Sequence, residues 1–413
     1  MAELRSGKLR LKDSTGFVPD EFGTGLLIPL LKESNADASR CDNYRGVTLS
    51  CVVSKLFEYD VLGKYGSLFV SDNLQFGFKN GVGCSDALFT VRSVVDHFNK
   101  NGCTVTMSAL DISKAFDRIS HFALFSKMMQ HNFPKQLINV LLSWYTKCCV
   151  KVKWKEEVSD SFQVQAGVRQ GGILSPFLFA LYIEDILKDL KSQKKGCCIN
   201  GIFLGCVLYA DDILLLSQSV MCMQSMLDIC RNVAKNLDLN FNVRKSAVIR
   251  IGTRFKLKCC DLLLDGQVIP YVNEVKYLGV VLRSGFVFSR SFIGAKIKFY
   301  RSFNAIYSKA SFATEDVLIN LFNAYCLPVI TYACEAVPPS KTDVKMLNKL
   351  ISHAYQKIFH TYDINVIYSA RLHFGMNDIE DILIFRRSTF VSRFLKKHFD
   401  FSALFDMMNR RLI

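Results

Sequence analysis

The sequence lacks the segments that mark secreted, membrane-spanning or disordered proteins. Its first fifteen residues contain no apolar core of the kind that a secretion signal needs. No run of 18 apolar residues occurs, and the nearest one, 201–216, carries Asp211 and Asp212 in its middle. Only 8 prolines and 23 glycines occur in 413 residues, which argues against long linkers. With 50% hydrophobic and 22% charged residues, the chain is globular, and its length favours two or three domains.

Cysteine is abundant, but the spacings that metal sites need are missing. The 15 cysteines include no C-x-x-C, and the pairs at 148–149, 197–198 and 259–260 are adjacent, which suits zinc poorly. The seven histidines do not pair with cysteines at ligand spacing either. We therefore expect reduced, small apolar cysteines in an intracellular protein, with nucleus or cytoplasm left open.

Acidic residues are outnumbered by basic ones. The chain has 52 Lys and Arg against 37 Asp and Glu, a formal net charge of +15. A surface of this charge attracts polyanions, with nucleic acid the first expectation and anionic membrane the second. An otherwise ordinary basic surface is the alternative, and charge alone does not separate these interpretations.

Apolar periodicity predicts an α+β core followed by an α-rich part from residue 286 onward. Residues 1–22 are expected to be a loose tail, and 34–46 and 75–83 to be loops. Ser175 as N-cap and Pro176 at the first position are expected to open a helix over 177–191. The other expected helices are 49–65, 86–100, two within 121–148, and 223–239. The expected strands are 25–32, 103–113, 149–154, 161–168, 241–252 and 274–282, with a hairpin over 201–217.

Three aspartates lie where apolar strands end. Asp211 and Asp212 interrupt the hairpin over 201–217, and Asp111 closes the strand that begins at 103. Burying ionised carboxylates without compensation is costly, and adjacent like charges add to that cost. A solvent-exposed turn would relieve it, and so would a divalent metal. Carboxylates suit Mg²⁺, and two such ions can activate a hydroxyl and stabilise the leaving oxygen in phosphoryl transfer.

Seven sequence blocks occur in a fixed order. They are NYRGVTLSCVVSKLFE, QFGFKNGVGCSDALF, ALDISKAFDRI, GVRQGGILSPFLFALYIEDI, YADDILLLS, FNVRKSAVIRIG and VKYLGVVL. Each block alone is weak, but in this order they resemble the motifs of reverse transcriptases. The first two, and YCLPVITYACEA downstream, resemble the forms found in non-LTR (LINE-type) retrotransposons. The resemblance runs from about residue 25 to about residue 340.

This resemblance implies an α+β right-hand polymerase fold with fingers, a palm whose antiparallel sheet is backed by helices, and an α-helical thumb. It implies fingers and palm over 23–285, the palm mainly at 103–121 and 166–285, and a helical thumb and C-terminal region over 286–413. The implied activity is RNA-directed DNA polymerisation, the template-directed transfer of deoxynucleotides to a primer 3′ hydroxyl. The implied partners are an RNA template with a DNA primer and deoxynucleoside triphosphates, without a membrane. The implied cofactor is Mg²⁺, as two ions for which Mn²⁺ can substitute.

The resemblance also assigns roles to single positions of this sequence. The catalytic residues would be Asp111, Asp211 and Asp212, which also hold the metals, and Lys245, a general acid toward pyrophosphate. Phe116 would lie under the sugar and exclude a 2′-OH. The other nucleotide-binding residues would be Arg45, Arg169, Gln170 and Gly171. The primer grip would be Tyr277, Leu278 and Gly279. A core aromatic is the alternative for Phe116, and solvated side chains are the alternative for Arg45 and Arg169. An ordinary strand-edge lysine is the alternative for Lys245.

Two further interpretations stay open at this point. One is a catalytically silent nucleic-acid-binding relic of the same fold, and the other is a group II intron maturase-like protein. Only 42 residues precede Asn43, and downstream we find neither a cysteine and histidine zinc cluster nor an acidic nuclease constellation. We therefore expect a polymerase truncated without its endonuclease, unable to perform target-primed insertion alone.

Overall fold

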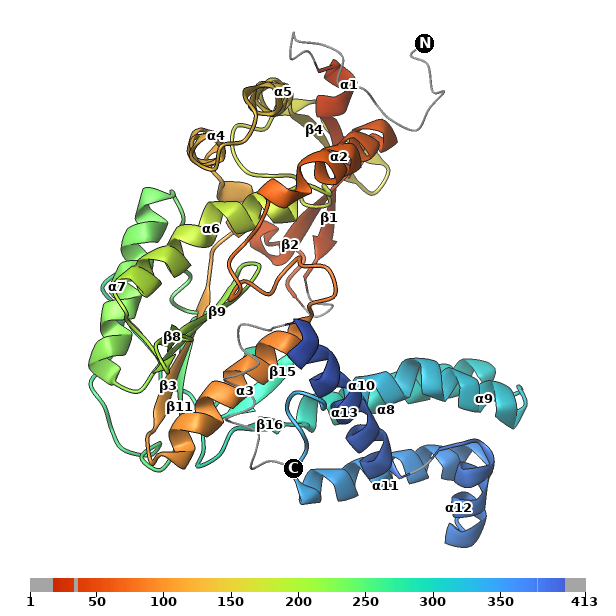
Figure 1. The fold of residues 1–413 in the computed structure, drawn as a ribbon. Coiled ribbons are helices and arrows are strands. Elements are labelled where there is room, and N and C mark those ends of the chain that lie inside the picture. Colours follow the sequence, from red (N-terminus) through yellow and green to blue (C-terminus); the bar gives the residue numbers. More distant parts are fainter. Residues whose placement is uncertain (1–17, 33–35, 377, 398–413) are drawn as a thin grey trace.

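A computed structural model describes residues 18–32, 36–376 and 378–397 of the chain (Figure 1). The upper part in Figure 1 combines the first strands with α4, α5 and β4, and the lower left holds a helix-covered sheet. Helices from the C-terminal third extend to the lower right. Within the described residues, no helix is long and apolar enough to cross a membrane.

The upper part is built on an N-terminal sheet. Strand β1 (Thr24–Leu31) pairs antiparallel with β2 (Tyr44–Ser50) and parallel with β4 (Cys149–Trp154). The sequence prediction missed β2, which lies at the edge of this sheet and pairs only with β1 among its strands. The remaining elements of this part are α1 (Asp20–Gly23), η1 (Cys41–Asn43), α2 (Val52–Tyr65), η2 (Gly66–Leu68), α4 (His121–Gln130), α5 (Lys135–Thr146), β5 (Glu157–Val158) and β6 (Phe162–Gln163).

The end of the expected loose tail is ordered instead. Val18 is buried, and the Phe22 ring lies 6.1 Å from Phe57 and 6.3 Å from Trp144. Burial of these apolar side chains against α2 and α5 outweighs the polarity of the residues around them. Residues 1–17 of that tail lie outside the described residues.

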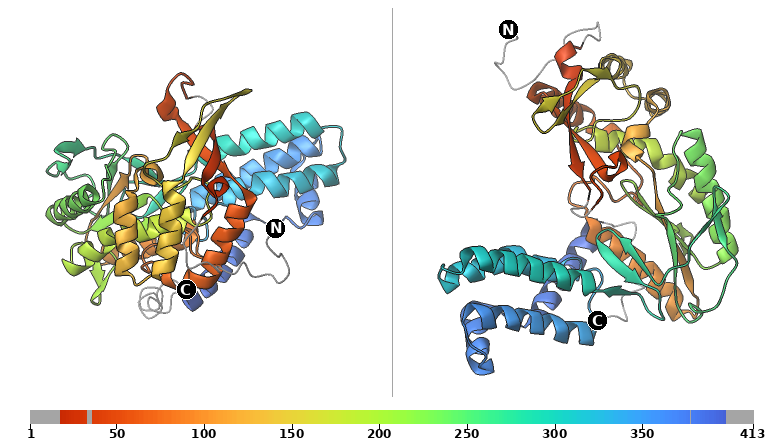
Figure 2. Two further views of the ribbon diagram at one scale, coloured as in Figure 1. Left: turned by 90° about the horizontal axis from the view of Figure 1, so that it is seen from above. Right: turned by 180° about the vertical axis from the view of Figure 1, so that it is seen from behind.

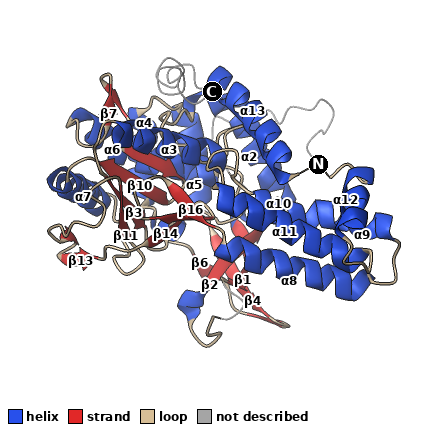
Figure 3. Ribbon diagram, turned by 90° about the horizontal axis from the view of Figure 1, so that it is seen from below, coloured by secondary structure: helices blue, strands red, loops and turns tan. Residues whose placement is uncertain are grey.

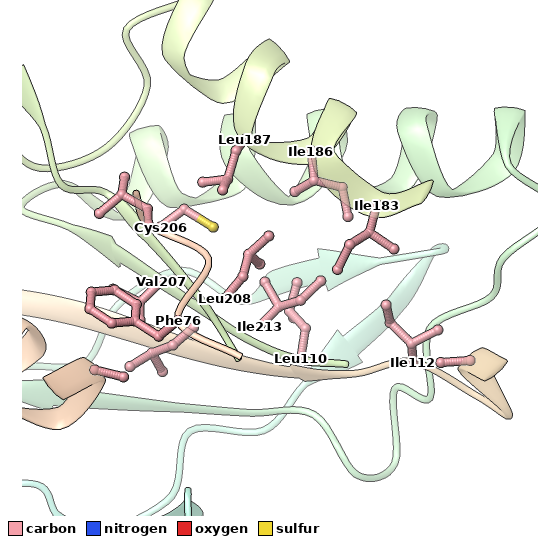
Figure 4. Packing of buried hydrophobic residues seen from close by; sticks show 14 of the residues in the cluster. Phe76, Leu110, Ile112, Ile183, Ile186, Leu187, Cys206, Val207, Leu208 and Ile213 are labelled. Carbon is pink, nitrogen blue, oxygen red and sulfur yellow. The ribbon is translucent and has the colours of Figure 1, made fainter. Parts of the chain in front are cut away.

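The central sheet has the antiparallel order β11-β3-β10-β9. Its strands are almost continuously apolar because helices cover them, as in any sheet without a free face. Ile183, Ile186 and Leu187 of α6 lie over Leu110 and Ile213 of the sheet (Figure 4). The strands are β3 (Val105–Asp111), β9 (Cys206–Tyr209), β10 (Asp212–Ser217) and β11 (Ala247–Ile251), and the covering helices are α3 (Cys84–Lys100), α6 (Ser175–Ser192) and α7 (Val220–Asn236).

Helix α6 starts differently from the prediction. Ser175 is the first helical residue rather than the N-cap, and Leu174 precedes the helix. The Glu58 carboxylate of α2 accepts hydrogen bonds from the backbone N–H groups of Ile173 and Leu174. A distant acidic side chain therefore takes over the capping that the local sequence was expected to supply.

A second, smaller sheet follows the central one. The predicted strand over 274–282 is in fact a hairpin of β14 (Glu274–Tyr277) and β15 (Val280–Arg283), which β16 (Ser289–Ser291) extends. The predicted strand over 241–252 is shorter, because residues 243–245 form a turn before β11. The other short elements are η3 (Ala115–Arg118) and the hairpins β7 (Cys198–Ile199) with β8 (Ile202–Phe203) and β12 (Leu262–Leu264) with β13 (Gln267–Ile269).

The C-terminal helices have their own apolar core, in which Phe299, Phe322 and Tyr355 are fully buried. Helices α8 and α11 run side by side in it (Figures 2 and 3). Helix α13, the last one within the described residues, returns to the central core, where Phe390 and Phe394 pack on Phe89 of α3 at 5.4 and 4.9 Å. The elements are α8 (Ile293–Ala310), α9 (Glu315–Leu321), a π-helical turn (Phe322–Cys326), α10 (Leu327–Thr331), α11 (Lys341–Ile358), α12 (Ile364–His373) and α13 (Ile379–Lys397).

Candidate active site

The three aspartates meet at one end of the central sheet. In the register of β3 and β10, Asp212 lies directly opposite Asp111. Asp212 also pairs with Tyr209 across the β9–β10 hairpin, so Ala210 and Asp211 form a two-residue turn. Strand pairing thus brings together carboxylates that are 100 residues apart in the sequence.

The electrostatics of this cluster disfavour ionised carboxylates. Partial burial, with the negative charges of Asp211 and Asp111, raises the pKa of Asp212 to about 6. Burial also raises the pKa of Asp111, with Asp211 adding to the increase and the positive charge of Lys245 opposing it. A bound cation would relieve this repulsion.

The donor chemistry of the three carboxylates fits a divalent cation. Hard cations such as Mg²⁺ take one or two carboxylates and complete their coordination with water and substrate phosphate. Within the described residues, no group of three or more His, Cys, Asp or Glu side chains is placed so that it could hold a metal ion by itself.

Lys245 lies in the turn before β11 rather than within the strand predicted over 241–252. The turn is joined to β3, because the Asn242 N–H donates to the Asp111 carbonyl at 2.7 Å. The Ser246 hydroxyl accepts from the Asp111 N–H at 3.3 Å. The Lys245 charge is thereby held close enough to act on the Asp111 carboxylate. Sequence reasoning missed Asn242 and Ser246, which lie within the block that contains Lys245.

Phe116 is held beside the carboxylates by aromatic packing. It belongs to η3, five residues beyond Asp111, and its ring stacks on Phe179 of α6 with centroids 4.6 Å apart. The Phe78 ring meets its edge at 6.4 Å. Phe116 is partly exposed, so it is both fixed and available to a ligand.

The segment Gln170–Gly171 packs on β2. The Gln170 carbonyl accepts from the Thr48 N–H at 2.9 Å, and its side-chain amide donates to Asp117 at 2.9 Å. Gly171 has a φ of 108°, and a Cβ there would lie 3.0 Å from the Thr48 carbonyl oxygen, so only glycine suits this position. Arg45 is exposed on the same strand.

Arg169 points away from these residues. Its guanidinium donates to the carbonyls of Phe22 at 2.7 Å and Gly23 at 3.1 Å, and it lies 5.0 Å from the centroid of the Trp144 ring. The guanidinium thus ties α1 to α5, whereas the resemblance implied that Arg169 binds the nucleotide. Two carbonyls and an indole face compensate for the burial of this charge.

The expected primer-grip residues form the β14–β15 turn. Leu278 and Gly279 have φ values of 46° and 77°, the pattern of a two-residue type I′ hairpin. The Tyr332 hydroxyl, from the residue after α10, donates to the Leu278 carbonyl at 3.0 Å. Tyr277 is 3% exposed, and burial raises the pKa of its phenol well above the ordinary value. Sequence reasoning missed Tyr332, which lies in the downstream block YCLPVITYACEA.

Comparison with known proteins agrees with this geometry. Residues 31–282 match the family model of reverse transcriptase (RNA-dependent DNA polymerase). A paired-carboxylate hairpin lies beside a third carboxylate on an antiparallel sheet, and the chain belongs to the reverse transcriptase family. Reverse transcriptases use divalent metal ions. The resemblance drawn from the seven blocks, and the α+β fold, are confirmed.

Its relatives come from non-LTR retrotransposons. The chain is 27% identical over 251 residues to the Pol polyprotein of the type-2 retrotransposable element R2DM of Drosophila melanogaster, covering 59% of this chain and 24% of that protein. It is 26% identical over 287 residues to the RNA-directed DNA polymerase from the Drosophila melanogaster mobile element jockey, covering 67% and 30%. It therefore spans about a quarter to a third of these relatives. A solved telomerase from Candida tropicalis shares 16% identity at a TM-score of 0.46, covering 67% of this chain and 56% of that one.

Proposed function

We propose that this chain is an RNA-directed DNA polymerase that extends a DNA primer along an RNA template. The observation that carries the proposal is the placement of Asp111, Asp211 and Asp212 at one end of the sheet, where partial burial and then mutual repulsion raise the pKa of Asp212. Membership of the reverse transcriptase family and the non-LTR origin of its relatives support it.

We infer that these three aspartates hold two Mg²⁺ ions, for which Mn²⁺ can substitute. When bound, the ions would supply positive charge to the primer 3′ hydroxyl and to the phosphoryl group being transferred. The task of the chain is to keep the three carboxylates together against their repulsion, which the β3–β10 register and the β9–β10 turn accomplish.

Other side chains would position the nucleotide and the primer. Phe116, fixed by Phe179, would lie against the sugar and exclude a 2′-OH. Arg45 and Lys245 supply positive charge for the triphosphate and the leaving pyrophosphate. Gln170 and Gly171 would contact the nucleotide, and the Tyr277–Gly279 turn would support the primer 3′ end. We assign Arg169 no contact with phosphate, because its guanidinium is already engaged.

We also propose the division into fingers and palm over 23–285 and a helical thumb from 286. The two separate apolar cores support a boundary in this region, although β16 still pairs with β15 after residue 286. The exposed basic residues Lys296, Lys298 and Arg301 on α8, with no acidic residue in that helix, suit phosphate contacts to a template–primer duplex.

The test is incorporation of deoxynucleotides on a primed RNA template with Mg²⁺. Wild-type protein should extend the primer, and Asp211→Ala should abolish extension. Asp228→Ala, which removes an exposed carboxylate from α7, should extend like wild type. Phe116→Ala should gain ribonucleotide incorporation. A folded wild-type protein that binds the duplex but adds no nucleotide would overturn the proposal in favour of a silent nucleic-acid-binding relic.

A further inference from the structure

The loop 74–78 lies along the edge of β9 that pairs with no other strand of the central sheet, next to the carboxylate turn. The Leu208 N–H donates to the Leu74 carbonyl at 2.9 Å, and the Phe76 N–H donates to the Leu208 carbonyl at 2.8 Å. These bonds make a parallel bridge between Gln75 and Leu208. Phe76 is fully buried in the central core beside Val207 (Figure 4). The loop is therefore fixed in register to the strand that leads into the turn.

Gln75 reaches from this loop to the turn itself. Its side-chain oxygen Oε1 accepts from the Ala210 N–H at 3.2 Å and from the Gly77 N–H at 3.0 Å. Gln75 is only 2% exposed, and Ala210 is buried as well. Since both neighbours are donors, the orientation of the amide is determined by its surroundings.

The contact restrains a backbone in an unfavourable conformation. Ala210 has a φ of 55°, in the left-handed region that residues with a Cβ rarely adopt. It immediately precedes Asp211. Nothing in the turn sequence favours this φ, because neither Gly nor Asn occupies the position.

Two further observations show how closely the loop 74–78 is fitted to the Ala210–Asp211 turn. A Cβ on Gly77 would lie 2.5 Å from the Ala210 nitrogen, so the loop comes as close as glycine allows. The Nε2 group of Gln75 is buried without a hydrogen-bond partner. An apolar side chain of the same length would avoid that cost but would leave the N–H groups of Ala210 and Gly77 without their acceptor, so the contact with the turn is what a glutamine supplies here.

We propose that Gln75 is a positioning residue for catalysis, which holds the Ala210–Asp211 turn so that the Asp211 carboxylate stays at the metal site. The inference rests on the proposed polymerase function. The same loop touches the nucleotide side of the site, because Phe78, with a φ of 61°, meets the edge of Phe116. One loop thus contacts both the carboxylate turn and the residue assigned to sugar selection.

The test compares Gln75→Met with wild type and with Gln193→Met, which alters an exposed glutamine after α6. Methionine matches the length of glutamine but offers no comparable acceptor. We expect the single-turnover rate of Gln75→Met to fall by about 10- to 100-fold, as misplaced catalytic groups do, with KM for the nucleotide and Kd for the duplex unchanged. The Mg²⁺ concentration for half-maximal rate should rise. Gln193→Met should match wild type in each measurement.

A second readout does not depend on activity. Amide hydrogen exchange at residues 209–212 should become faster in Gln75→Met and stay unchanged in Gln193→Met. If Gln75→Met does not fold, Gln75→Asn retains the amide but is too short to reach Ala210, and the same losses are expected. A folded Gln75 variant with wild-type rate and wild-type exchange would overturn the inference. If wild type itself is inactive, the polymerase proposal fails, while exchange still shows whether Gln75 restrains the turn.

Discussion

Two hairpins with two-residue turns lie at the site, and they differ in charge and in their use of glycine. The β9–β10 turn carries Asp211, and its Ala210 has a φ of 55° without the help of glycine. The β14–β15 turn has no charge and places Leu278 at a φ of 46° and Gly279 at a φ of 77°, of which only the glycine adopts its value readily. Each turn thus holds one residue with a Cβ in the left-handed region, and only the first turn adds charge repulsion.

Each turn is held by a side chain from a distant part of the chain. Gln75, before α3, accepts a hydrogen bond from the N–H of Ala210, whereas Tyr332, after α10, donates one to the carbonyl of Leu278. The charged turn is therefore held by a loop that precedes it in the sequence and packs in the central core. The apolar turn is held by a residue from the C-terminal helical region.

The largest expected effect is a loss of activity without a loss of stability when the Asp111 carboxylate, opposite the carboxylate turn, is neutralised. Asp111→Asn should lower nucleotide incorporation by about 1,000-fold or more, because it removes a metal-binding carboxylate. The melting temperature should stay equal or rise, because the change relieves repulsion with Asp212. Steady-state incorporation and calorimetry measure the two quantities. Loss of both activity and stability would show that Asp111 is structural.

The second prediction concerns crowding at the apolar turn. Gly279→Ala should destabilise the protein by about 1–3 kcal/mol, because the residue has a positive φ and a Cβ would lie 3.2 Å from the Tyr332 ring. Gly266→Ala is the matched control, with a φ of 74° and open space around its Cβ. Urea denaturation should give the smaller loss for Gly266→Ala. Equal losses would mean that the Tyr332 contact does not matter.

The third prediction uses one chemical change at two tyrosines. Tyr332→Phe should cost about 1 kcal/mol of stability, because it removes the hydrogen bond to Leu278, and it should weaken primer binding. Tyr277→Phe should be neutral or stabilising, because the buried Tyr277 hydroxyl has no hydrogen-bond partner. Thermal denaturation and primer titration of both variants test this. A larger loss for Tyr277→Phe would reverse the assignment.

The smallest expected effect is a pH dependence confined to the carboxylate turn. Asp212 has a folded-state pKa of about 6 against an ordinary value of 3.8, so the folded protein takes up a proton before the unfolded chain does. The unfolding free energy should therefore gain a contribution from Asp212 as pH falls from about 6 to about 4. Asp212→Asn should lack that contribution, which metal-free unfolding curves at several pH values would reveal. An identical pH profile for both proteins would contradict the raised pKa.

Much of the fold followed from local patterns. The amphipathic helices at α3, α5 and α7, and the apolar hairpin around Asp211, were predicted because their periodicities extend over many residues. Strand β2 and the turn before β11 were not predicted, because their conformation depends on pairing with β1 and β3 rather than on their own composition. Arg169 was predicted to bind the nucleotide or to be solvated, and the sequence has no signal for the carbonyls that its guanidinium contacts instead.

The sequence by itself determined the chemical groups and their order. At the ends of the apolar runs lie Asp111, Asp211 and Asp212, where buried strands must stop and charges can reach water. The sequence alone therefore indicates their role. Only the tertiary structure decided which backbone groups restrain them. Gln75 and Tyr332 look ordinary in the sequence, and each acts on a turn 135 or 54 residues away through a single hydrogen bond. Such a bond depends on atomic distances between segments that only the packed chain brings together.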